Sequence, residues 1–337
     1  MRALAAALPD ALIAGYRAGV ELARPLPVDD LRVVAVGMGG SAIAFDLARG
    51  VVEAESRASL SVVRAPVLPR SVDGRTEVFV ASYSGDTWES LAAYDAAGRA
   101  GARRTVIASG GALLERAERD GVPTLTLPPG LPPRAAVGQM LGGVLGLLDS
   151  SFPESLETRI AGVADATRER IREYARARGP AAATAKKIGA RLPFVYAEHA
   201  FVALARRWKT QVEENAKRPA AFDEVPELFH NAIVGWDAVS RRDAAKYVAV
   251  LLEWSAESPS VRTSFEYLAR LLRARGVAVA RAALSAEDRL EAVVCGVALG
   301  DHVSLFLAEQ ARVDPYPFDA ITRFKSALGN PADAGGS

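Results

Sequence analysis

Short apolar runs alternate with longer stretches of helical periodicity over the first 130 residues. The runs are Val33–Val36, Leu60–Val63, Val78–Ala81, Thr105–Ala108 and Thr124–Leu127. The helix-like stretches between them are Ala42–Gly50, Trp88–Ala100 and Ala112–Asp120. Apolar strands joined by helices are typical of βαβ units. We therefore predict a parallel sheet covered by helices on both faces, with a ligand site at the carboxyl ends of its strands.

The second half of the chain repeats this pattern less regularly. Residues 154–192 are charged, rich in Ala and Arg, and predicted to form a helical bridge between a first domain, 1–153, and a second, 193–337. The predicted strands of the second domain are Phe194–Ala197, Ala232–Gly235, Val248–Glu253 and Val277–Ala280. Its predicted helices are Ala200–Lys217, Ser260–Arg275 and Ala286–Gln310. We expect an α/β fold of two doubly wound domains, the second a degenerate echo of the first.

Composition narrows the class of protein. The 337 residues are half apolar, and 41 Lys and Arg nearly balance 40 Asp and Glu, which argues against a nucleic-acid partner. The single cysteine, Cys295, excludes an internal disulfide, and its apolar neighbours indicate core packing. Asp10, Arg17 and Glu21 interrupt the apolar start of the chain, so we expect a cytoplasmic protein. The apolar stretch Ala135–Leu148 is shorter than the roughly 20 residues that span a membrane, and we predict a buried helix there.

A glycine-rich loop, GMGGSA, follows the first predicted strand. Gly37, Gly39 and Gly40 allow the backbone to approach a ligand closely. Ser41 stands where a helix N-cap is expected, and free amides at that position favour an anion.

The same loop also fits the dinucleotide pattern G-x-G-x-x-A. A dinucleotide site requires an acidic residue about 20 positions further on, at the end of the second strand. That strand ends in Arg64, and Glu53 and Glu55 come too early. Because Arg64 could suit a 2′-phosphate, the nicotinamide alternative stays open at this point.

A second loop, SYSGDT, follows the third predicted strand. Ser82, Ser84 and Thr87 can each donate a hydroxyl hydrogen bond, and Asp86 and Thr87 open a helix whose amides add to them. Two such loops on neighbouring strands would form a cup of neutral donors that suits a phosphate monoester. The alternative is that these residues are ordinary caps and turns.

Together, GMGGSA and SYSGDT resemble the sugar isomerase (SIS) domain, in which the serines and threonine of these loops bind a sugar phosphate. Over nearly its whole length the chain resembles the bifunctional phosphoglucose/phosphomannose isomerases of archaea and some bacteria. The resemblance implies two SIS-type domains that interconvert glucose 6-phosphate and mannose 6-phosphate with fructose 6-phosphate through a cis-enediol. It implies no metal and no nicotinamide cofactor. Asp86 departs from the family, which more often has Asn there.

The segment RRWKTQVEENAKRP carries candidates for a general base. Glu213 and Glu214 fall near the end of a helix closed by Pro219, where the helix dipole tends to raise the pKa of a carboxyl. The resemblance assigns Glu214 as the base, leaves Glu213 as a solvated neighbour, and gives His230 a part in ring opening. The three histidines are too widely spaced for a short metal-binding motif, so we expect no metal site.

Two cations complete the predicted site. Arg134 begins an apolar helix, where its charge opposes the helix dipole unless an anion lies nearby; the alternative is an arginine that faces solvent. Lys325 lies on a predicted C-terminal helix capped by Gly329, where an ordinary surface lysine is the alternative. The resemblance implies that Arg134 stabilises the enediolate and that Lys325 reaches over the site and assists ring opening.

The resemblance also implies a homodimer, because in the family the histidine matching His230 enters the site of the neighbouring subunit. Phe229, Ala232 and Tyr316 differ from the residues most common in the family. These departures leave two alternatives open: a sugar-phosphate sensor without catalysis, and an SIS isomerase for another phosphorylated sugar.

Overall fold

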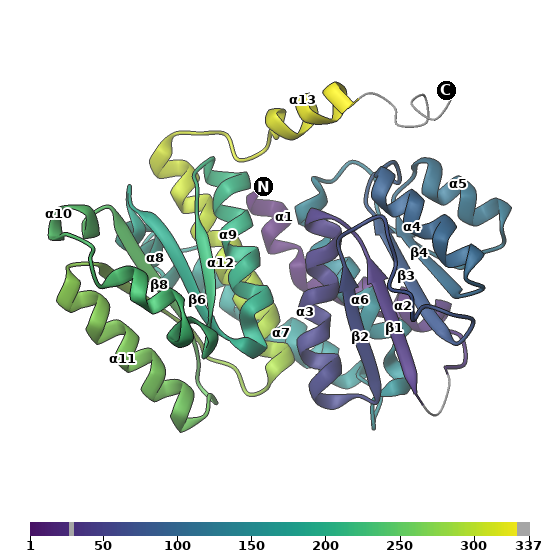
Figure 1. Cartoon of the computed structure of the whole chain (residues 1–337), viewed down its shortest axis with the longest axis horizontal. Coiled ribbons are helices and arrows are strands. Elements are labelled where there is room, and N and C mark those ends of the chain that lie inside the picture. Colours follow the sequence, from purple (N-terminus) through teal and green to yellow (C-terminus); the bar gives the residue numbers. More distant parts are fainter. Residues whose placement is uncertain (27–29, 329–337) are drawn as a thin grey trace.

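The computed structural model describes residues 1–26 and 30–328 of the chain and contains two parallel sheets side by side (Figure 1). The first sheet has the strand order β2-β1-β3-β4-β5, with every pair parallel. Its strands are β1 (Leu31–Val36), β2 (Ala58–Val63), β3 (Thr76–Ser82), β4 (Arg103–Ala108) and β5 (Thr124–Thr126). The five predicted strands of the first domain are therefore confirmed.

Helices cover both faces of the first sheet. The helices of this half are α1 (Arg2–Ala6), which lies beside α12, and α2 (Leu8–Leu22), α3 (Gly39–Glu55), α4 (Trp88–Arg99), α5 (Gly111–Arg119) and α6 (Val137–Leu147). The 3₁₀ helix η1 (Pro133–Ala136) leads directly into α6, every residue of which is buried except Gln139. The buried helix predicted over Ala135–Leu148 is therefore confirmed.

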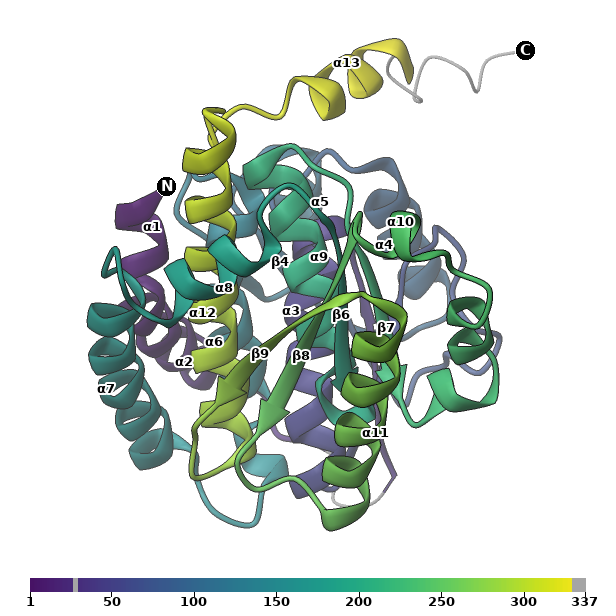
Figure 2. The same cartoon turned by 90° about the vertical axis from the view of Figure 1, so that its left-hand side faces the viewer.

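The second sheet has the order β7-β6-β8-β9, so β6 occupies the place that β1 has in the first sheet (Figure 2). Its strands are β6 (Leu192–Glu198), β7 (Ala221–Val225), β8 (Tyr247–Trp254) and β9 (Ala278–Leu284). The helices of this half are α7 (Glu157–Tyr174), α8 (Pro180–Ile188), α9 (Val202–Ala216), α10 (Arg241–Ala244), α11 (Pro259–Arg275), α12 (Arg289–Ala311) and α13 (Asp319–Leu328). As predicted, the second sheet repeats the topology of the first, but the described residues contain no counterpart of β5. The domain boundaries at 153 and 193 stay a prediction.

One predicted strand of the second sheet is wrong. Residues 232–235 form part of a 3₁₀ helix, η5 (Ala232–Trp236), and Val234 is 64% exposed rather than buried in a sheet. The strand that pairs with β6 is instead β7, whose sequence AFDEV has adjacent acidic residues. Because β7 is an edge strand, it needs no continuous apolar run, and its pattern is weak in the sequence.

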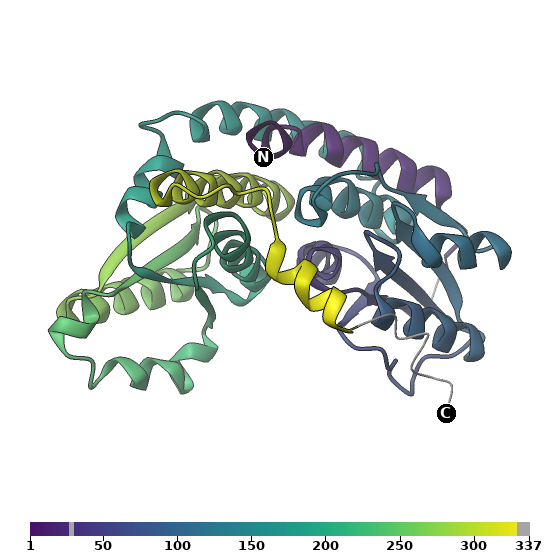
Figure 3. The same ribbon diagram turned by 90° about the horizontal axis from the view of Figure 1, so that it is seen from above.

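A single apolar core connects the two sheets. It includes Val33 and Phe79 from the first sheet and Val195 and Val250 from the second. Figure 3 shows α9, α12 and α3 between the sheets. The outer faces are covered separately, by α4 and α5 on the first sheet and by α11 on the second.

Helix α12 is the one helix among the described residues that is long and apolar enough to cross a membrane, by length and composition alone. Of its most apolar window, 83% is buried inside the protein, as in a central core helix.

Helices α3 and α9 lie against each other in opposite directions, which positions the site. Helix α3 begins at the carboxyl edge of the first sheet, after β1, and α9 begins at the carboxyl edge of the second, after β6. Near the end of α3, a Cβ added to Gly50 would lie 2.9 Å from the carbonyl oxygen of Ala200, just before α9. The end of α3 thus meets the start of α9, and the start of α3 faces the end of α9.

Candidate active site

The two hydroxyl-rich loops are neighbours in the structure. Strands β1 and β3 pair directly, with Val36 opposite Val80, so the loops that follow them share one edge of the sheet. In the strand order 2-1-3-4-5 this is the switch point, where α/β sheets bind their ligands. The prediction that the two loops come together is confirmed.

Ser41 connects these loops, but not as a helix cap. Helix α3 begins at Gly39 with Met38 as its N-cap residue, and Ser41 lies inside the first turn, 5% exposed. Its Oγ accepts a hydrogen bond of 3.2 Å from the backbone N–H of Tyr83, in the second loop. The prediction that Ser41 is the N-cap residue is therefore wrong, because Gly39 and Gly40 are already helical and Met38 is the N-cap residue.

The two loops together keep three hydroxyl hydrogens available for a ligand. Ser82 Oγ donates to Thr87 Oγ1 at 3.0 Å and accepts from the Gly85 N–H at 3.1 Å. Among the described residues, the hydroxyl hydrogens of Ser41, Ser84 and Thr87 have no protein acceptor. Thr87 is also the N-cap residue of α4, as predicted. These donors and the amides at the start of α3 are neutral groups of the kind that can bind an anion.

Asp86 is held by the neighbouring helix. Its Oδ1 accepts a hydrogen bond of 2.9 Å from the N–H of Ala112, in the first turn of α5. A carboxylate at this position is stabilised by the positive end of the helix dipole. The departure from asparagine is therefore compatible with the loop, since the charge has a partner of its own.

The start of α3 approaches the segment that carries Arg134. A Cβ added to Gly40 would lie 3.3 Å from the carbonyl carbon and oxygen of Pro133 and 3.4 Å from the Arg134 nitrogen. A larger residue would press on this backbone, so glycine permits the close approach. Gly39 has a φ of +49° and open space around it.

Arg134 is buried at the junction of the two halves, 2% exposed, which contradicts the solvent-facing alternative. Its Nη1 lies 3.3 Å from Glu214 Oε2, and its Nε donates to Asn215 Oδ1 at 2.9 Å. Its Nη2 donates to the carbonyl oxygens of Pro315 and Tyr316 at 2.5 and 3.2 Å. The anion that a buried arginine requires is thus a carboxylate 80 residues away in the chain.

Glu214 lies in the last turn of α9, partly buried beside this guanidinium. Burial raises the pKa of its carboxyl above the ordinary value, although Arg134, Arg207 and Lys217 each act to lower that pKa. Its neighbour Glu213 pairs instead with Lys209 Nζ at 2.7 Å. Glu214 therefore has the environment of a general base, and Glu213 does not.

Sequence reasoning missed a row of polar side chains behind this pair. Arg207, Gln211 and Asn215 are buried on one face of α9. Arg207 Nη2 donates to both carboxylate oxygens of Asp301, at 2.8 and 2.9 Å. Their spacing of four residues was a signal in the sequence, since it places three polar side chains on one helix face.

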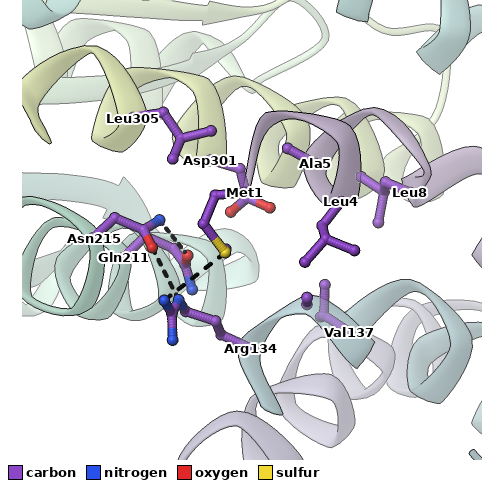
Figure 4. Close-up of a pocket in the computed structure, with 11 residues that line it drawn as sticks. Met1, Leu4, Ala5, Leu8, Arg134, Val137, Gln211, Asn215, Asp301 and Leu305 are labelled. Carbon is purple, nitrogen blue, oxygen red and sulfur yellow. Dashed lines mark hydrogen bonds between the residues drawn. The ribbon is translucent and has the colours of Figure 1, made fainter. Parts of the chain in front are cut away.

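A small cavity of about 10 Å³ lies beside this row, between α1, α6, α9 and α12 (Figure 4). It has room for about one water molecule. Figure 4 shows Met1 and Arg134 pointing toward each other across it, with a sulfur–nitrogen distance of 3.9 Å. Asp301 and Leu305 of α12 line the opposite wall.

The segment between α12 and α13 closes over Arg134. Lys217 Nζ donates to the carbonyl oxygen of Glu214 at 2.6 Å and also to that of Pro317. In Figures 1 and 3, α13 lies at the same end of the molecule as the start of α3 and extends toward the first sheet. Lys325 lies on α13, so the predicted helix is confirmed, while Gly329 lies outside the described residues.

His230 is not brought to this site within one chain. It ends the 3₁₀ helix η4 (Glu227–His230), beyond the carboxyl end of β7, and is exposed. Glu214 lies at the opposite end of α9, a helix of 15 residues and therefore about 22 Å long. Phe229 packs near Tyr267, with ring centres 6.0 Å apart, and Ala232 is exposed.

The structure argues against a dinucleotide site, because Arg64, the candidate for binding a 2′-phosphate, is already paired. Arg64 forms an ion pair with Asp46 of α3, whose carboxylate is buried. Its guanidinium is thus neutralised by the protein rather than offered to a 2′-phosphate.

Cys295 is buried in α12, as predicted. Within residues 1–26 and 30–328, no three His, Cys, Asp or Glu side chains gather as metal ligands do.

Comparisons with known proteins identify the family. Residues 177–328 match the bacterial phospho-glucose isomerase C-terminal SIS domain. The bifunctional phosphoglucose/phosphomannose isomerase of Caldicellulosiruptor bescii is 33% identical over 335 residues, which cover 97% of this chain and 98% of the relative. The enzyme of the same name from Aquifex aeolicus is 32% identical, over 88% of this chain and 90% of its own.

Solved structures share the fold at lower identity. Tagatose-6-phosphate ketose/aldose isomerase from Escherichia coli superposes with a TM-score of 0.70 at 18% identity, covering 92% of this chain and 93% of its own. With its two parallel sheets, adjacent hydroxyl-rich loops and near full-length relatives, the chain belongs to the bifunctional phosphoglucose/phosphomannose isomerase family.

Proposed function

We propose that this protein is an aldose–ketose isomerase that interconverts fructose 6-phosphate with glucose 6-phosphate and mannose 6-phosphate. The observation that carries the proposal is the buried Arg134–Glu214 pair beside the start of α3. Isomerisation requires a carboxylate that takes the C2 proton of the open-chain sugar and a cation where the oxyanion develops. That pair supplies both groups.

In this proposal the phosphate is bound by the hydroxyls of Ser41, Ser84 and Thr87 and the amides of Gly39 and Gly40. Ser82, predicted as a further donor, instead donates to Thr87 and orients its hydroxyl. Neutral donors and a helix start hold a dianion without a lysine. Anchoring the phosphate fixes the distance of the second carbon from the base.

Glu214 then moves a proton between C2 and C1 through a cis-enediol while Arg134 stabilises the negative charge on oxygen. If the open-chain sugar rotates within the site, the same base meets the C2 proton of either epimer. One site then serves both the glucose and the mannose phosphate. No metal or nicotinamide takes part in these steps.

Ring opening comes before this proton transfer, and we assign it to Lys325 and to His230 of a second copy of the chain. The exposed position of His230, at the far end of α9 from Glu214, supports a composite site in a symmetric homodimer.

The proposed interconversion belongs to carbohydrate metabolism, in glycolysis and gluconeogenesis, and the cytoplasm is the expected location.

The test mixes purified protein with fructose 6-phosphate and EDTA and assays for glucose 6-phosphate and mannose 6-phosphate. We expect both products, and Glu214→Gln should lower kcat by about 10²-fold or more while the sugar phosphate still binds. The control is Glu213→Gln, which removes the neighbouring carboxylate and should leave kcat unchanged.

Two outcomes would contradict the proposal. Binding without any product would favour a non-catalytic sensor, and turnover only on another phosphorylated sugar would favour a different SIS isomerase. Full activity in Glu214→Gln would refute the assignment of the base alone.

A further inference from the structure

The side chain of Asn215 is the buried neighbour of the proposed base and is 1% exposed. Its Oδ1 accepts a hydrogen bond of 2.9 Å from Arg134 Nε. Its Nδ2 donates to Gln211 Oε1 at 3.0 Å and to Ser304 Oγ, on α12, at 2.9 Å. Figure 4 shows the bonds from Asn215 to Arg134 and to Gln211. Every hydrogen and the oxygen of this amide therefore have a partner.

The orientation of the amide is fixed by Ser304. The hydroxyl of Ser304 donates its single hydrogen to the carbonyl oxygen of Asp301 at 2.7 Å, so toward Asn215 it can only accept. If the amide turned over, its NH₂ group would face the N–H of Arg134 Nε, and two donors would meet in a buried place. The hydrogen-bond chain from α12 thus keeps the oxygen of Asn215 on the guanidinium.

The orientation of Arg134 follows from that bond. Its Nε is held by Asn215, and its Nη2 is held by the carbonyl oxygens of Pro315 and Tyr316. Because a guanidinium is planar and rigid, two fixed edges determine the direction of the third. The remaining nitrogen, Nη1, is the one that faces Glu214, at 3.3 Å.

A neutral side chain at position 215 also leaves the charge of Arg134 available. The other arginine nearby, Arg207, is already paired with the carboxylate of Asp301. An aspartate at 215 would accept the same Nε bond, but its charge would offset that of Arg134. It would also add a second negative charge beside Glu214.

We propose that Asn215 is a positioning residue of the isomerase: its locked, neutral amide aims the Arg134 guanidinium at the base and at the oxyanion that forms there. The inference rests on the proposed function, because it acts on the same proton transfer. Asn215 need not touch the substrate for this role.

The principal variant is Asn215→Asp, which keeps the size and the acceptor oxygen, removes the NH₂ group that donates to Gln211 and Ser304, and adds a charge. We expect kcat for fructose 6-phosphate isomerisation to fall about tenfold or more while KM changes less than about twofold. We also expect the acidic limb of the profile of kcat/KM against pH to move to higher pH. The charge of Asp at 215 would offset that of Arg134, which lowers the pKa of Glu214. The loss of kcat at nearly unchanged KM is the test of positioning, because any negative charge added beside Glu214 would raise the pKa of its carboxyl.

Ser304→Ala is the second variant, with Ser151→Ala as its matched control. Both serines are buried and donate to the carbonyl oxygen three residues earlier, but Ser151 has no contact with Asn215 or Arg134. Ser304→Ala should lower kcat about threefold or more at unchanged KM, because it leaves one N–H of Asn215 without its acceptor. Ser151→Ala should keep the kcat of the unmodified enzyme.

Wild-type kcat and an unmoved acidic limb in folded Asn215→Asp would overturn the positioning role. If that variant does not fold, equal kcat in Ser304→Ala and Ser151→Ala would overturn it instead. A wild-type protein without isomerase activity would refute the proposed function first, which is a different result. Circular dichroism of each variant confirms that the comparison is made on folded protein.

Discussion

Opposing influences on one carboxyl set the pH at which the proposed base can act. Burial raises the pKa of Glu214, and the charges of Arg134, Arg207 and Lys217 lower it, with a net rise. The base must be ionised to take a proton, so activity is lost as the pH falls through this raised pKa. An ordinary glutamate would lose its charge only near pH 4.3.

We therefore expect the acidic limb of the kcat/KM profile to lie above that of an ordinary glutamate. Lys217→Gln removes one of the cations that lower the pKa of Glu214, so it should move the limb to still higher pH. Lys209→Gln, whose lysine pairs with Glu213 instead, should not move it. A limb at the ordinary value, unaffected by Lys217→Gln, would contradict the environment described for Glu214.

Asp86 offers a second test at the scale of one residue. Its carboxylate accepts a hydrogen bond at the start of α5, beside the loop that holds the phosphate in our proposal. Asp86→Asn keeps the acceptor oxygen but removes the charge, which should cost about 0.3–1 kcal/mol of unfolding free energy. The KM for the dianionic sugar phosphate should fall about twofold at low salt, because a repulsive charge is gone. A KM that rises, or does not depend on salt, would show that the charge does not act on the phosphate.

The loops themselves depend on backbone contacts between elements. Gly85 has a φ of +79°, and an added Cβ would lie 1.8 Å from the carbonyl oxygen of Gly110, at the start of α5. Gly101 has a similar φ of +70° but has nothing within 4 Å of an added Cβ. The two glycines share the conformational requirement, but an added Cβ collides only at Gly85.

Gly85→Ala should therefore lower the free energy of unfolding by more than about 2 kcal/mol, and Gly101→Ala by only about 1 kcal/mol. Since Gly85 also donates its N–H to Ser82 Oγ, its variant should raise the KM for the sugar phosphate. Urea unfolding and initial-rate kinetics on both variants measure these effects. Equal losses would mean that the loop can shift away from Gly110.

The sequence predicts elements well where the burial pattern is simple. The inner strands β1, β3 and β4 are mostly buried apolar runs, because helices cover both faces of the sheet there. The edge strand β7 was missed, since a half-covered strand tolerates Asp223 and Glu224. The apolar pattern predicts a strand over residues 232–235, because four residues do not distinguish a buried strand from a short turn of helix.

The residues of the site were found mainly through resemblance, because their meeting is a property of the whole molecule. Arg134 and Glu214 belong to opposite halves, and only the opposite directions of α3 and α9 bring them together. No local pattern carries that information. The polar row Arg207, Gln211 and Asn215 is local and was visible, but its role depends on α12.

A composite site makes a quantitative prediction for the assembled protein. Glu214→Gln and His230→Ala should each be nearly inactive alone. Mixed and refolded in equal amounts, they should form mixed dimers in which one of the two sites holds an intact Glu214 and an intact His230. Random assembly then restores about a quarter of the wild-type activity.

Separate variant preparations that are never co-assembled are the control for this experiment. Absence of any recovery in a mixture that contains mixed dimers would show that His230 acts within its own chain or not at all. A size measurement that finds only active monomer would exclude the dimer itself.

The apolar core that runs between the two sheets also limits how substrates enter. Any hinge motion between the halves would split that core and expose α12, whose surface is covered by elements of both. Such splitting carries a large cost in hydrophobic free energy, so the halves should act as one rigid body. Entry and release of sugar phosphates would then depend on the 10-residue helix α13 swinging aside, rather than on half the protein opening.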